Sequence, residues 1–338
     1  MTNIDPNFPL IDLHRHIEGG IRINTIINLA REHDIPLPAW DEESLRQYIQ
    51  VIEPQPGVMA FIEKIEMAAS VLVDYAACRR VAIENVEDAQ AEGLDYVELR
   101  FSPYFMAQSH GLDPLGIVES VADGVEAGRI ATGMKVNLIG IISRTYGPEA
   151  AGDELAALLM QRDKFVGIDL AGDEEKFPGE LFVDHISKAR DAGWQVTIHA
   201  GESSGPESVW QAIRDLGAVR IGHAVHAVED ASLLDYMAEH GIGIETNLTS
   251  NVQTSTVPNY ESHPLRYFLE LALCGTINTD DPRISGIDIQ YEYDVAAPAA
   301  GLSVEQIHQA QRNSLQAAFL SDQEKEALIQ RCTRDISS

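Results

Sequence analysis

The stretch LIDLHRHIEGG, residues 10–20, decides between two folds for this chain. Its first seven residues begin with the apolar Leu10, Ile11 and Leu13 and form a short run that is typical of a buried strand. An open doubly wound sheet usually places a glycine-rich loop after its first strand. Here the strand runs into His-Arg-His-Ile-Glu-Gly-Gly, which contains neither a GxGxxG motif nor a phosphate-binding lysine. The stretch therefore favours a closed barrel over the open sheet.

Strand-like and helix-like segments alternate along the rest of the chain. Amphipathic stretches such as 149–162 and 206–216 separate most of the strands, and this alternation is typical of parallel βαβ units. About eight units in 338 residues indicate an α/β protein with a (β/α)8 TIM barrel. The expected strands are 10–16, 96–102, 135–142, 165–171, 195–200, 220–225, 241–247 and 275–278.

One connection is too long for a simple unit. Residues 19–93 carry a helical pattern almost throughout, so we expect extra helices inserted after the first strand, over the barrel mouth where active sites of this fold lie. Phe61, Ile62 and Ile65 would line a hydrophobic lid there, or belong to ordinary helix core. Residues 304–330 predict C-terminal helices. No repeat or linker divides the chain, so we expect one barrel domain spanning 1–338.

The composition limits the partners. The chain has 24 basic and 53 acidic side chains, a net charge of -29, which would repel nucleic acid and an anionic membrane but not a small neutral substrate. Its three cysteines are far apart and form no CxxC motif, which argues against a disulfide framework. We expect no secretory signal and no membrane span, and hence a soluble, cytoplasmic protein. The sequence leaves the oligomeric state open.

Metal-type side chains stand at the ends of several predicted strands. His14 and His16 are two residues apart, so they point to the same face of a strand. A lone HxH pair more often reflects packing than metal binding, but His199, His223 and Asp280 also stand at or just beyond the ends of later strands. Three histidines and one aspartate at strand ends converge in a barrel into a three-nitrogen, one-oxygen site. Zinc in such a site would lower the pKa of its water to about 7.

Carboxylates and a glycine beside these positions indicate hydrolysis. Glu202 lies three residues past the histidine of the fifth strand, and a carboxylate that is not itself a ligand can move protons in metal-assisted hydrolysis. The alternative is a helix N-terminal Glu stabilised by the helix dipole. Asp281 could contact a substrate, although Asp-Asp-Pro is also a turn signal. Gly172 would let a ligand approach a backbone N–H group, or is simply a loop glycine.

Five motifs, taken in order, resemble those of the adenosine deaminases, which are metal-dependent (β/α)8 enzymes of the amidohydrolase superfamily. They are HRHIEG at 14–19, DLAGDE at 169–174, HAGE at 199–202, GH at 222–223 and NTDDP at 278–282. VELRFSP at 97–103 is similar to the family's second-strand motif. The resemblance covers nearly the whole chain, and the bacterial enzymes look most similar.

The resemblance implies an activity and a cofactor. The activity is hydrolytic deamination of adenosine and 2′-deoxyadenosine to inosine and 2′-deoxyinosine, with release of ammonia, in purine salvage. The cofactor is one Zn²⁺ per subunit, held by His14, His16, His199 and Asp280. The substrate would be a small purine nucleoside, with no nucleic-acid or membrane partner.

The resemblance also implies how the purine is bound. Glu202 would protonate N1, while His223 and Asp280 would orient the water that attacks C6 and take its proton. Asp281 would hydrogen-bond N7, and the backbone N–H of Gly172 would meet N3.

Position 18 separates two related activities. Glu18 and His16 would touch the ribose, but adenosine deaminases usually have Asp where this chain has Glu18, and a Glu resembles the related adenine deaminases. Thr279 and the RFSP segment at 100–103 look like the adenosine enzymes. The sequence therefore favours a nucleoside, with deamination of adenine or of a modified 6-aminopurine as the alternative.

Two further alternatives are weaker. A non-catalytic purine-binding homologue would not need the ligand and acid–base residues, all of which are present here. A phosphotriesterase-like hydrolase usually needs a bridging lysine for a second metal, and no lysine ends any predicted strand.

Overall fold

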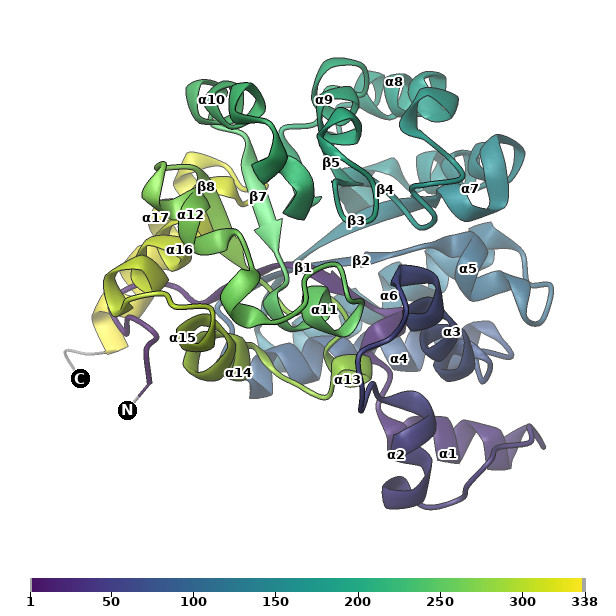
Figure 1. Cartoon of the computed structure of the whole chain (residues 1–338). Coiled ribbons are helices and arrows are strands. Elements are labelled where there is room, and N and C mark those ends of the chain that lie inside the picture. The colour runs from purple at the N-terminus through teal and green to yellow at the C-terminus, as the bar shows by residue number, and fades with distance from the viewer. Residues whose placement is uncertain (1, 336–338) are drawn as a thin grey trace.

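Eight parallel strands follow one another around a single sheet, in the order β1 to β8 (Figure 1). The structure is a computed structural model and describes residues 2–335. Helices surround the strands on the outside, as the sequence predicted. The strands are β1 (Ile11–His16), β2 (Tyr96–Phe101), β3 (Lys135–Ser143), β4 (Phe165–Ala171), β5 (Gln195–Ala200), β6 (Arg220–His223), β7 (Gly243–Thr246) and β8 (Cys274–Ile277).

The segment that follows β8 closes the sheet against β1. The backbone N–H of Asp280 donates to the carbonyl of His14 at 2.8 Å, and the N–H of His16 donates to the carbonyl of Asp280 at 2.8 Å. Two residues earlier, the Asn278 side chain accepts the N–H of Leu13 at 2.9 Å. These contacts join the first and last strands, and the predicted (β/α)8 barrel is confirmed.

The predicted end of the sixth strand was wrong. The sequence placed a strand at 220–225, but β6 ends at His223. His223 and Ala224 have φ values of 66° and 52°, in the left-handed region that side chains other than glycine rarely adopt. The chain therefore turns out of the sheet two residues earlier than its apolar pattern indicated.

The first connection contains a short 3-10 helix (Glu18–Gly20) and four α-helices: α1 (Ile23–Glu32), α2 (Glu42–Ile49), α3 (Val58–Ala69) and α4 (Tyr75–Ala91). This confirms the insertion predicted after the first strand. Figure 1 shows α1 and α2 projecting beside the barrel, whereas α3 lies against the strand ends.

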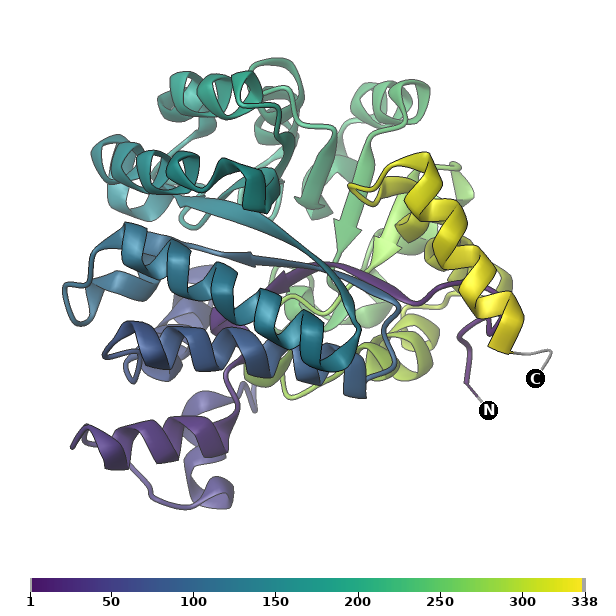
Figure 2. The same ribbon diagram turned by 180° about the vertical axis from the view of Figure 1, so that it is seen from behind.

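Most of the remaining helices cover the outside of the barrel, whereas α11 and α13 lie near the pocket. In Figure 2, α4 and α6 lie side by side in front of the strands, on the outside of the barrel. Gly124 and Gly128 of α6 allow this approach, because a Cβ at these positions would lie 2.4 Å from the Arg79 carbonyl oxygen and 2.8 Å from the Val86 Cβ. These helices are α5 (Pro103–Gln108), α6 (Pro114–Thr132), α7 (Gly147–Met160), α8 (Val183–Asp191), α9 (Pro206–Arg214), α10 (Ala231–His240), α11 (Leu248–Gln253), α12 (Leu265–Glu270), α13 (Pro282–Ser285), α14 (Ile289–Tyr291), α15 (Ala297–Ala299), and the predicted C-terminal pair α16 (Val304–Ala317) and α17 (Asp322–Asp335).

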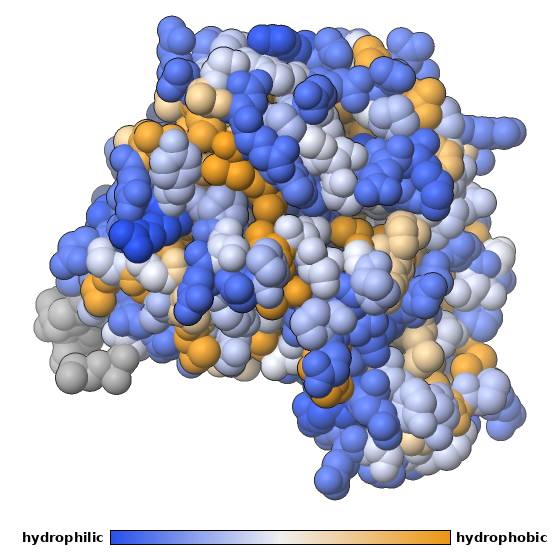
Figure 3. Space-filling model, viewed as in Figure 1, coloured by the Kyte–Doolittle hydropathy of each residue, from blue (hydrophilic) through white to orange (hydrophobic). Residues whose placement is uncertain are grey.

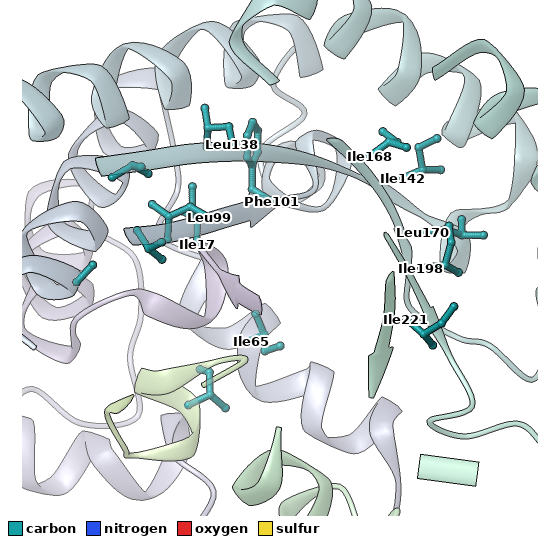
Figure 4. Close-up of a cluster of buried hydrophobic side chains, with 14 of the residues drawn as sticks. Ile17, Ile65, Leu99, Phe101, Leu138, Ile142, Ile168, Leu170, Ile198 and Ile221 are labelled. Atoms are coloured by element: carbon teal, nitrogen blue, oxygen red, sulfur yellow. The ribbon is translucent and has the colours of Figure 1, made fainter. Parts of the chain in front are cut away.

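The hydrophobic core lies between the strands and the helices. Alternate strand residues face opposite sides, so in β5 Val196 and Ile198 pack in this core while Thr197 and His199 make polar contacts inside the barrel. Figure 4 shows part of the core, including Leu99, Phe101, Leu138, Ile142, Ile168, Leu170, Ile198 and Ile221. Because the apolar strand residues face the helices, the inward-facing positions can hold polar and ionised side chains.

Hydrophilic side chains cover most of the face drawn in Figure 3, in keeping with the net charge of -29. Over residues 2–335, none of the helices combines the length and the apolar character needed to cross a membrane.

Candidate active site

The carboxyl ends of β1, β5 and β6 and the segment after β8 bring their polar side chains to one place. Ligand-type atoms of His14, His199, His223 and Asp280 all lie within 4.8 Å of one another. His16 joins them, because its Nε2 is 3.3 Å from the Nε2 of His14 and 3.3 Å from Asp280 Oδ1. The side chains that the sequence predicted to converge do so.

The outward-facing nitrogens of two histidines are bound to buried carboxylates. The Nδ1 of His14 is 2.8 Å from Glu245 Oε2, and the Nδ1 of His199 is 2.9 Å from Asp169 Oδ2. Since a carboxylate can only accept, each Nδ1 carries the hydrogen, and each Nε2 presents a lone pair to the cluster. Metal-binding histidines typically use one ring nitrogen for the metal and donate the N–H of the other to a carboxylate of this kind. The donor set of the described residues therefore fits a metal ion.

Two of these positions have unusual backbones. His223 has φ 66° and Asp280 has φ 65°. Such conformations in residues other than glycine often occur at functional sites. At both positions the turn directs the side chain into the cluster at the point where the strand ends.

Glu202 is held beside this cluster by a second carboxylate. Glu174 accepts the backbone N–H groups of residues 201–204 at 2.7–3.2 Å, and this fixes the loop that carries Glu202. Burial, together with the charges of Asp280 and Glu174, raises the pKa of Glu202 well above its usual value. A raised pKa favours the protonated form of the Glu202 carboxyl, which is the form that can donate a proton.

Two more buried carboxyls border the same space. Asp281 Oδ1 and Glu18 Oε2 have no hydrogen-bond partner within the described residues. Burial first, and then the charges of Asp280 and Glu18, raises the pKa of Asp281, while burial raises that of Glu18 to about 8. Gly19 makes room for Asp281, because a Cβ on Gly19 would lie 1.7 Å from its Oδ1.

A pocket opens from these residues toward α3. Eight of the nine predicted site residues line it, namely His16, Glu18, Gly172, His199, Glu202, His223, Asp280 and Asp281, and His14 is buried behind them. Apolar side chains of α3 border the opening, where Phe61 and Ile65 are buried and Val58 and Ile62 half-buried. The predicted lid residues thus line the pocket. No lysine or arginine is among the described residues around it.

Several supporting residues were missed in the sequence. Glu245 accepts hydrogen bonds from Arg100 Nη2 at 2.8 Å and from His14, and Arg100 also donates to Asp169 at 2.9 Å. Glu245 also forms an ion pair with Arg220, whose Nε lies 2.6 Å from its Oε1. Buried ion pairs of this kind fix the side chains that contact the pocket. The available signal was an acidic residue within an apolar strand, as Glu245 is in GIGIETN at 241–247.

The fold and this cluster define a class of protein. A (β/α)8 barrel with a buried histidine and aspartate group suited to a metal ion, beside a buried carboxyl whose pKa is raised, is the arrangement of a metal-dependent hydrolase.

The sequence identifies the family within that class. It matches the family described as Adenosine deaminase over residues 9–334, and the chain belongs to this family. It is 55% identical over 325 residues to the adenosine deaminase of Edwardsiella ictaluri, covering 96% of this chain and 98% of that protein. It is 56% identical over 331 residues to that of Klebsiella pneumoniae, covering 98% and 99%. A crystal structure of adenine deaminase from Arthrobacter aurescens superposes with a TM-score of 0.89 at 25% identity, over 98% and 100% of the two chains.

Proposed function

We propose that this protein hydrolyses adenosine and 2′-deoxyadenosine to inosine and 2′-deoxyinosine, releasing one ammonia for each water consumed. The observation that carries the proposal is the buried Glu202, whose pKa is raised, beside the histidine and aspartate cluster in a pocket lined by no lysine or arginine among the described residues. The relatives named adenosine deaminase, at 55–56% identity, support this substrate over adenine.

The metal we propose is a single Zn²⁺ per subunit, bound by His14, His16, His199 and Asp280. The choice of His16 rather than His223 follows the resemblance to the adenosine deaminases, and it is supported by the distance of 3.3 Å from His16 Nε2 to Asp280 Oδ1, against 3.8 Å from His223 Nε2 to Asp280 Oδ2. Three imidazoles and one carboxylate suit zinc. Bound there, zinc would lower the pKa of a water molecule and so make it a nucleophile at neutral pH.

The pocket offers hydrogen-bond donors to the three ring nitrogens that accept in adenine. Protonated Glu202 donates to N1, protonated Asp281 donates to N7, and the N–H of Gly172 donates to N3. The raised pKa values of the two carboxyls support these roles. Protonation at N1 lets the ring accept electrons when water adds to C6. His223 and Asp280 orient this water and take its proton, and ammonia then leaves.

The ribose side of the pocket favours a nucleoside over a nucleotide. Glu18 and His16 would contact the sugar, and Glu66 stands at the opening. A 5′-phosphate would meet these carboxyl groups with no lysine or arginine among the lining residues.

The site uses residues from β1 to the segment after β8, which supports one barrel domain over 1–338. None of the three cysteines forms a disulfide, which supports the proposed cytoplasmic location.

A substrate panel tests the proposal. Initial rates of ammonia release would be measured for zinc-loaded protein with adenosine, 2′-deoxyadenosine, adenine and AMP at equal concentration. We expect rapid turnover of both nucleosides and little of adenine or AMP. Faster turnover of adenine would mean that Glu18 has reshaped the sugar side of the pocket, and would favour adenine deaminase.

A further inference from the structure

His263 stands in a loop before α12, and its sequence context gave it no role. In the structure it is only 3% exposed, and it is linked to the pocket through Asn251 of α11. His263 Nε2 is 3.1 Å from Asn251 Oδ1, and Asn251 Nδ2 is 2.9 Å from the Nδ1 of His223. A continuous hydrogen-bonded chain therefore runs from a buried loop residue to a side chain of the proposed active site.

A backbone N–H group sets the donor-to-acceptor direction of this series of hydrogen bonds. The N–H of Leu265 can only donate, and it lies 3.2 Å from His263 Nδ1, so this nitrogen accepts. Burial lowers the pKa of His263 to about 3, so the ring is neutral and its single hydrogen sits on Nε2. That hydrogen is donated to Asn251 Oδ1. The amide of Asn251 is thereby oriented with its Nδ2 hydrogens toward His223.

The same direction continues into His223. Its Nδ1 accepts from Asn251, so in the neutral ring the hydrogen must be on Nε2. Other groups near the ring do not reverse this. Glu202 Oε1 is 3.6 Å from Nδ1, beyond hydrogen-bond distance, and Asn247 Nδ2 is almost equidistant from the two ring nitrogens at 3.3 and 3.4 Å.

We infer that Asn251 and His263 are positioning residues that fix the orientation and tautomer of His223. His223 then presents an Nε2–H donor toward Asp280 Oδ2, 3.8 Å away, where it can donate to a water that binds beside both side chains. This refines the proposed function, on which it rests. His223 orients the attacking water by donating to it, and Asp280 alone accepts the proton that the water loses on adding to C6.

Two substitutions at His263 separate this role from simple packing. In His263→Gln, the side-chain amide can place an N–H group where His263 Nε2 donates, which keeps the link to Asn251. In His263→Asn, the shorter side chain can place an oxygen where Nδ1 accepts, which keeps the contact with Leu265 N–H but loses the link. We expect His263→Asn to lower kcat at least about tenfold with KM within about twofold, and His263→Gln to stay near the wild-type rate.

The tautomer itself is read without substrate. The ¹⁵N shifts of labelled histidines in the full-length, zinc-loaded protein distinguish the two tautomers, with the His223 signals assigned by their loss in His223→Gln. We expect the hydrogen on Nε2 in the wild type and in His263→Gln. Asn251→Asp replaces the donating amide by an acceptor, so it should move the hydrogen to Nδ1 and lower kcat at least about tenfold.

Asn137→Asp is the matched control, because Asn137 also donates through Nδ2 but contacts Tyr96 and Phe319 away from the pocket. It should leave the His223 signals and kcat unchanged. A wild-type His223 with its hydrogen on Nδ1 would overturn the inference, as would an active His263→Asn beside an inactive His263→Gln. A wild type that does not deaminate adenosine would instead refute the proposed function, while the ¹⁵N result would still decide the tautomer.

Discussion

The two ends of the pocket are built in opposite ways. At the inner end, the inner cluster (His14, His16, His199, His223, Glu202, Asp280 and Asp281) stands on strand ends, and several of its members are tied to buried partners such as Glu245, Asp169 and Asn251. At the outer end, the mouth (Val58, Phe61, Ile62 and Ile65 of α3) is apolar and comes from the inserted connection.

This difference separates reaction from selection. The position of a hydrogen-bonded group at the inner end is fixed by directional contacts, so small displacements should affect the reacting atoms. Apolar contact at the mouth is proportional to buried area and is not directional. We therefore expect changes at the inner cluster to lower kcat or metal binding, and changes at the mouth to raise KM.

The largest effect should come from loss of a proposed ligand. His199→Ala removes one imidazole from the cluster, so we expect loss of stoichiometric zinc and a fall in kcat of about 1,000-fold or more, because a catalytic metal contributes several kcal/mol. Metal analysis of the purified variant, with rates on adenosine, checks this. The exposed His240 provides the control in His240→Ala. Full zinc occupancy in His199→Ala would remove His199 from the ligand set.

A smaller effect should follow when a ligand is kept but its partner is altered. Asp169→Asn exchanges the carboxylate that accepts from His199 Nδ1 at 2.9 Å. We expect zinc affinity to fall about 10- to 100-fold, in the range found for such partners. Competition with a chelator measures it, and the exposed Asp191→Asn on α8 is the control. Equal affinities in the two variants would mean that the outer contact does not support the ligand.

Glu18 lies between the two ends, and its length should affect substrate choice. Glu18→Asp shortens the carboxyl by one methylene, so it should open space for the ribose and raise the ratio of adenosine to adenine turnover by about tenfold. Initial rates on both substrates measure this ratio. Glu63→Asp, on the exposed side of α3, should leave it unchanged. A lower ratio in Glu18→Asp would show that the longer side chain assists ribose binding.

The smallest effect should come from the mouth. Ile62→Ala removes half-buried apolar surface beside the pocket, so KM for adenosine should rise about three- to tenfold with kcat within about twofold. Steady-state kinetics measure both. Ile130→Ala, where Ile130 is 73% exposed on α6, should change neither. A fall in kcat alone would break the division between reaction and selection.

The fold and the pocket residues were readable from the sequence for a local reason. The inner-cluster residues stand where apolar runs end, and in a barrel the carboxyl ends of strands meet at one face. His14 and His16 could be paired by their spacing alone. The left-handed backbone of His223 and Asp280 could not be predicted from the sequence, because it follows from the way the chain leaves the sheet toward other elements.

The supporting residues were hidden because their contacts are distant in sequence. His14 and Glu245 are 231 residues apart, and Arg100 and Glu245 are 145 apart. His263 has only a loop context in the sequence, yet its burial and the Leu265 N–H give it a defined tautomer. Such roles depend on packing that no short stretch encodes.

The Glu202→Gln variant is the most direct test of the proposal that the inner cluster carries out the reaction. The substitution keeps the size of the side chain, but the amide that replaces the carboxyl cannot give up a proton to N1. With zinc-loaded protein and saturating adenosine, we expect bound zinc to remain stoichiometric and kcat to fall about 100- to 10,000-fold, the range for loss of a general acid. A variant that keeps its zinc and turns over adenosine near the wild-type rate would contradict the proton-donor role of Glu202 and, with it, the account of the inner cluster.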